Sequence, residues 1–75
     1  MQGPVAGDVI LRGSIEDGFE LVDAVSERSL VRNLLSIAAA VEAARVRGAP
    51  QIWQQIVDRR GRPMGEPFRL FQPIA

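Results

Sequence analysis

The chain has 75 residues, a formal net charge of zero, and neither cysteine nor histidine. A chain this short buries only about 60% of its unfolded surface, so we expect one domain over residues 1–75 with a thin core and loose ends at about 1–7 and 72–75. Disulfides are excluded. Since the usual zinc and copper ligands are also missing, we expect no metal and no cofactor.

The charges are divided unevenly along the chain. Residues 1–44 carry seven acidic residues against three arginines, a net charge of −4, and residues 45–75 carry six arginines against two acidic residues, a net charge of +4. The division favours two halves that neutralise each other, either within one fold or across a homodimer. A basic face for an anionic partner is the alternative.

The first part of the chain predicts a β-hairpin. Residues 8–14 read as a strand with Val9 and Leu11 on one side and Ile10 and Arg12 on the other. Glu16-Asp17-Gly18 supplies turn residues, and the segment 19–23 then alternates apolar and acidic side chains. We expect these two strands to pair.

Residues 24–35 allow two interpretations. In the first, a loop over 24–28 leads into a third strand at 29–33. In the second, a helix begins near Ser26, because Leu30 and Leu34 continue the helical spacing of Ile37, Val41 and Ala44. A helix of about 21 residues is long for so small a domain, so we favour the strand.

Residues 36–47 predict a helix. Ser36 is a suitable N-cap, the segment is rich in alanine, and Gly48 can take the left-handed conformation that ends a helix. Ile37, Val41 and Ala44, with Ala40 beside them, form a narrow apolar stripe that we expect to face the core.

Residues 51–57 again fit a strand or a helix. The strand is favoured because the segment is rich in β-branched and aromatic residues, and because residues 62–71 offer a hairpin partner. Pro63 and Pro67 lack amide donors, so we expect the last strand to be short and to lie at an edge of the sheet.

These segments together predict an α+β fold. We expect a small antiparallel sheet of three to five strands, covered on one face by a helix at about residues 36–47, in the order ββ(β)αββ.

Three segments carry a resemblance to known domains. Residues 19–23, 36–45 and 57–62 resemble small uncharacterised bacterial domains of ββαβ type, in which a hairpin precedes a Ser- or Thr-capped, alanine-rich helix and a strand ends in an Asp-x-x-Gly-Arg turn. The resemblance covers residues 9–62. It implies the fold and a bacterial origin, and it implies no catalytic residue.

The residue types argue against an enzyme. Histidine, cysteine, lysine and tyrosine are all absent, so no serine has a usual general base, and Ser36 is explained as a helix cap. The candidate binding residues lie in one stretch that combines the sole tryptophan with an amide and three guanidinium groups. They are Trp53, Gln55, Arg59, Arg60 and Arg62.

Two functions fit this sequence. The first is a protein-interaction or self-association module, since one face of the sheet lies away from the helix and exposed Ile10, Val22, Phe71 or Ile74 can form an apolar patch there. The alternative is weak binding of nucleic acid or another anion by the arginines of residues 59–62. The near-neutral charge disfavours nucleic acid. With no long apolar run, we expect a soluble, cytoplasmic protein that does not bind membranes.

Overall fold

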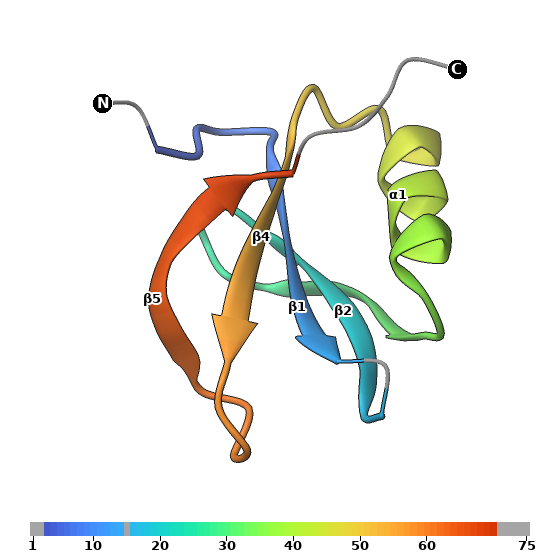
Figure 1. Ribbon diagram of the computed structural model, residues 1–75. Coiled ribbons are helices and arrows are strands. Elements are labelled where there is room, and N and C mark those ends of the chain that lie inside the picture. Colours follow the sequence, from blue (N-terminus) through green and yellow to red (C-terminus); the bar gives the residue numbers. More distant parts are fainter. Residues whose placement is uncertain (1–2, 15, 71–75) are drawn as a thin grey trace.

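A computed structural model describes residues 3–14 and 16–70, over which the chain forms five strands and one helix (Figure 1). The expected α+β class and the order β-β-β-α-β-β are confirmed. The expected exposure of Phe71 and Ile74 and the expected loose end at 72–75 lie outside the described residues. The elements are β1 (Val9–Ser14), β2 (Gly18–Asp23), β3 (Ser29–Leu34), α1 (Ile37–Val46), β4 (Ile52–Val57) and β5 (Pro63–Arg69).

The strands lie in the order β3-β2-β1-β4-β5. Three of the pairings are antiparallel, as expected, but β1 and β4 are parallel, so the sheet is mixed rather than antiparallel. The connectivity explains the difference. Two hairpins make β3 parallel to β1, and α1 then returns the chain to the end of the sheet where those strands begin, so β4 runs in the same direction.

Both ambiguous segments are strands. β3 pairs with β2, which excludes the helical alternative, and its partly buried Leu30, Val31 and Leu34 pack against the core. β4 is likewise a strand, and β5 lies at the edge. β5 is longer than expected because it begins at Pro63, where it pairs with Val57.

Helix α1 has the expected ends. The Ser36 hydroxyl accepts a hydrogen bond from the Ala39 amide at 3.0 Å. After Arg47, Gly48 takes a φ of +75°, and the amides of Gly48 and Ala49 bond to the carbonyls of Arg45 and Ala44. This is the Schellman arrangement, in which a left-handed glycine lets the last carbonyls find donors.

The core-facing stripe of α1 is narrower than expected. Ala40 and Ala44 are fully buried, whereas Ile37 is 40% exposed. The reason is the position of the helix, which packs against β2 and β3. Val41 lies on the flank of the helix that faces β4, as the groove lined by Val41 and Ile52 shows. The helical spacing places Ile37 one turn earlier on that flank.

The sheet is buried on both of its faces near the centre. Val9, Leu11, Phe19 and Leu21 form the core beneath α1. On the other face, Ile10 and Val22 pack against Trp53 and are only 3% and 2% exposed. The expectation that Ile10 and Val22 form an exposed patch is therefore wrong, because the large indole of Trp53 covers them.

Candidate protein-interaction surface

Trp53 and Gln55 lie within the sheet face opposite α1. The Trp53 indole is 6% exposed, and its Nε1–H donates to Asp8 Oδ2 at 2.9 Å. Gln55 is also buried; its amide oxygen accepts from Arg12 Nε, and its amide nitrogen donates to the Gly65 carbonyl. Both side chains hold strands together, so the face of the indole is not available to stack on a base.

The three arginines lie at the β4–β5 turn, away from the indole. The Arg59 and Arg60 side chains are exposed, and Arg62 Nε pairs with Asp58 Oδ2 at 3.3 Å. The Asp58 carboxylate also accepts the backbone N–H groups of Arg60 and Arg62. The five predicted site residues therefore do not form one site. Trp53 and Gln55 are buried structural side chains, whereas the three arginines lie at a turn that the Asp58 carboxylate stabilises.

Two surface aspartates, Asp58 and Asp23, each stabilise a turn by accepting hydrogen bonds from nearby backbone N–H groups. The N–H of Arg62 is the main cause that lowers the pKa of Asp58 below its ordinary value of 3.8. In the β2–β3 loop, Asp23 accepts from the backbone and hydroxyl of Ser26 and from the Val25 amide, and these bonds lower its pKa from the same value. Hydrogen bonds that favour a carboxylate stabilise the folded state wherever the carboxylate is ionised.

The stability of the protein should therefore fall in acid. Because both folded-state pKa values are depressed, this stabilisation is present above the unfolded value, near pH 4, and is lost as the pH falls through the folded-state values. We expect the double variant Asp23→Asn/Asp58→Asn, which keeps an acceptor at each turn, to lose less stability below about pH 4 than the wild type. Urea unfolding across an acid pH series measures this. If the free energy of unfolding falls equally steeply with pH in the two proteins, these turns are not the acid-sensitive elements.

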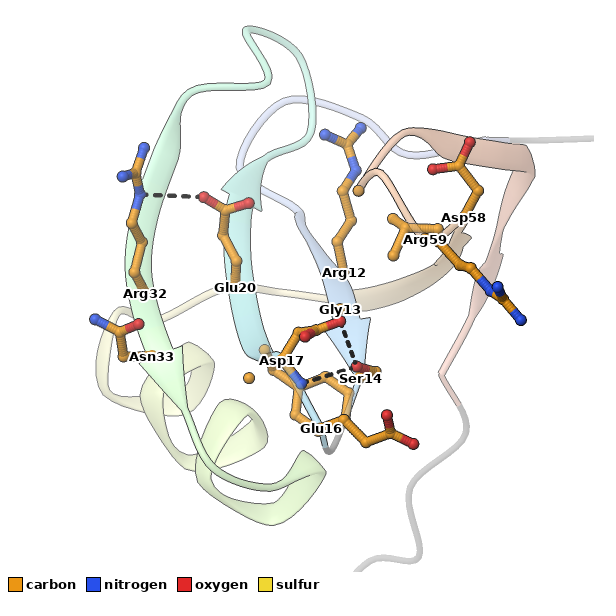
Figure 2. A pocket seen from close by; sticks show the side chains of 14 residues that line it. Arg12, Gly13, Ser14, Glu16, Asp17, Glu20, Arg32, Asn33, Asp58 and Arg59 are labelled. Atoms are coloured by element: carbon orange, nitrogen blue, oxygen red, sulfur yellow. Dashed lines mark hydrogen bonds and ion pairs between the residues drawn. The ribbon is translucent and has the colours of Figure 1, made fainter.

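A groove of about 520 Å³ separates the tips of the two hairpins on the face opposite α1 (Figure 2). Its charged groups largely neutralise one another. Arg32 pairs with Glu20 at 3.3 Å, and Arg12 bonds at 2.6 Å to Glu27, which lies outside the groove lining. The Ser14 hydroxyl contacts Asp17, and Figure 2 shows these two residues side by side at the end of β1. A groove of such mixed and paired charges offers little attraction to a ligand of one sign.

The face on the α1 side is only half covered. Neighbouring strands lie about 4.8 Å apart, so a five-stranded sheet is roughly 20 Å wide, whereas a helix with its side chains is about 10–12 Å wide. α1 packs against β2 and β3, and β5 is at the far side of the sheet (Figure 1). The β4–β5 part of this face therefore remains uncovered among the described residues.

Three large apolar side chains occupy this uncovered part, which we call the open half. Ile56 lies opposite Met64 in the β4–β5 pairing, and Phe68 lies opposite Gln54, so all three share the face that β4 turns toward α1. Ile56 is 57% exposed, Met64 55% and Phe68 46%. Such a cluster on a strand pair differs from scattered surface residues and is typical of an interaction surface.

The flank of α1 forms a wall beside the open half. A groove of about 350 Å³ runs between Val41 of the helix, Ile52 of β4 and Leu70, which follows β5. Ile37 lies one turn from Val41 on the same flank and is 40% exposed. Arg45, Gln51 and Arg69 also line this groove. We call the open half and this groove, which lie on the same face of the sheet, the trough.

The edges of the sheet are poorly suited to pairing with another strand. Pro63 and Pro67 remove two amide donors from β5, and the Gly65 carbonyl already accepts from Gln55. On β3, the pairing register shifts and Asn33 has a φ of +61°, which breaks the regular ladder. A partner would therefore bind to a face of the sheet more readily than to an edge.

Sequence reasoning missed Ile56 and Met64 as surface residues. Phe68 was expected in an edge strand, but not on an uncovered face of the sheet. Which face is uncovered depends on where α1 lies, and no local sequence pattern indicates that position. The sequence did hold one signal, the number of elements. A single helix is too narrow to cover a sheet of five strands, so part of one face must stay exposed.

Searches with known protein families, curated proteins and solved structures find no match for this chain. The resemblance to bacterial ββαβ domains therefore stays a prediction. Among the described residues, no helix is long and apolar enough to cross a bilayer, and no three acidic side chains lie together as a metal site.

Proposed function

We propose that this chain is a cytoplasmic, non-catalytic module of bacterial origin that associates with protein through the open half of its sheet. The observation that carries the proposal is the half-exposed cluster of Ile56, Met64 and Phe68 on the same face of the sheet as α1. Leaving this surface in water is unfavourable, because each square ångström of apolar surface that is buried contributes about 25 cal/mol. Covering it gives association a driving force.

The surrounding structure supports association over catalysis. The polar side chains of the opposite face are used in bonds between strands, such as Arg12 with Gln55 and Trp53 with Asp8. A nucleic-acid site at the β4–β5 turn has less support, since Trp53 is buried and Arg62 is paired with Asp58. The trough is the feature that these internal bonds leave unused.

Site-specific photo-cross-linking in cells tests the proposal. A photoreactive phenylalanine analogue replaces Met64 in one variant and Val25 in another; Val25 is similarly exposed but lies in the β2–β3 loop. We expect cross-linked protein adducts from position 64 and markedly fewer from position 25, because position 64 lies at the contact. Equal or absent adducts at position 64 would overturn the association function.

A further inference from the structure

We infer that the occupant of the trough is a second copy of this chain, whose own open half packs face to face against the first. This inference rests on the association function proposed above and adds the identity of the partner. Its geometry follows from the half-covered sheet: each sheet is covered on one half by its own α1, and the other half is available to the β4–β5 hairpin of the second copy. A two-fold axis through the two clusters of Ile56, Met64 and Phe68 satisfies both chains at once.

Over residues 3–14 and 16–70 the chain has no second helix with which to fill the trough of another copy. Ala40 and Ala44 of α1 are already buried against the chain's own sheet. The strand edges are blocked by the prolines of β5 and the irregular β3, which removes edge-to-edge pairing of two sheets. Among the described elements, packing of the two open halves is thus the symmetric contact that buries the apolar cluster.

Charge is also complementary between the wall and the occupant. Arg45 lines the trough on the α1 side, its side chain is 68% exposed, and its contact with Glu42 is long, at 4.0 Å. Glu66 lies between Met64 and Phe68 on β5 and is exposed. When the β5 strand of one copy enters the trough of the other, Glu66 approaches the partner's wall, and two-fold symmetry makes the contact twice. Because each copy carries both Arg45 and Glu66, the same surface supplies both partners of the ion pair.

Sedimentation equilibrium of the purified full chain tests the inference. We expect a reversible dimer at micromolar concentrations, and a dissociation constant raised at least about tenfold by Met64→Glu, since a charge is placed in an apolar contact. Val25→Glu adds the same charge at a similarly exposed loop position and should leave the dissociation constant unchanged. Circular dichroism confirms that each variant is folded.

A charge exchange tests the geometry. Arg45→Glu and Glu66→Arg should each weaken the dimer by about threefold to tenfold, because an exposed ion pair contributes modestly and this one occurs twice. The double variant should restore the dimer, because the two charges are exchanged.

A strictly monomeric wild type would overturn the inference, and so would a dimer unaffected by Met64→Glu. Failure of the double variant to restore the dimer would overturn the Arg45–Glu66 contact on which the geometry rests. A monomer that still gives cross-links from position 64 to another protein would overturn the second copy as occupant while the association function stands. A monomer with no such cross-links would overturn both.

Discussion

Gly13→Ala should destabilise the protein by about 3 kcal/mol, at the upper end of single-residue effects. Gly13 lies in β1 opposite Phe19 with a φ of +121°, where a side chain is strained. A Cβ atom there would lie 2.9 Å from the Phe19 Cα and closer still to the Gly18 carbonyl oxygen. Because both neighbours are backbone atoms of β2, the clash can be relieved only by separating the two strands.

The matched control is Gly61→Ala in the β4–β5 turn. Gly61 also has a positive φ, +79°, but a Cβ there would meet nothing within 4 Å. Its cost should be about 1 kcal/mol, from backbone conformation alone. Urea unfolding followed by circular dichroism measures both values against a total stability of about 4–11 kcal/mol for a chain of this length. Similar losses in the two variants would contradict the close approach of β1 and β2.

Asp8→Ala should cost about 2 kcal/mol. Asp8 is 1% exposed, and its Oδ2 accepts from the Trp53 indole and from the Val5 amide. Removing the carboxylate leaves a buried indole N–H without an acceptor, and such a group costs about 1–3 kcal/mol. The bond joins residues 45 positions apart, so its loss weakens the pairing of β1 with β4. Unfolding monitored by Trp53 fluorescence measures the effect.

The variant Asp8→Asn separates the hydrogen bond from the charge. Asparagine keeps an oxygen acceptor for the indole and removes a buried carboxylate whose Oδ1 has no partner among the described residues. We expect it to cost less than about 1 kcal/mol. A loss as large as that of Asp8→Ala would mean that the negative charge of Asp8, rather than its role as acceptor, stabilises the strands.

Local signals were sufficient for most of the fold. The Ser36 cap and the Gly48 stop act within one helical turn, so the ends of α1 follow from adjacent residues. The alternation of residues 19–23 gave the correct inward face, with Phe19 and Leu21 buried. The strand at 29–34 was harder, because the same apolar residues fit a helical spacing and the pairing with β2 decided between them.

Features that depend on distant residues were not predictable from local patterns. The parallel pairing of β1 with β4 follows from the return path of the chain through α1. The partners of Arg12 lie 15 and 43 residues away, and the acceptor for Trp53 lies 45 residues away. The exposed apolar face was assigned to the wrong side for the same reason: Trp53 covers Ile10 and Val22, while α1 leaves Ile56 and Met64 uncovered.

Methyl NMR on dilution of the wild-type chain provides the most direct test of association through the open half. The methyl signals of Ile56 and Met64 should shift progressively as the protein is diluted through the micromolar range, because these groups leave the contact between copies. The methyl signals of Val25, which is exposed in the β2–β3 loop, should stay fixed. Signals of Ile56 and Met64 that do not change with concentration, or shifts confined to Val25, would contradict the packing of two open halves against each other.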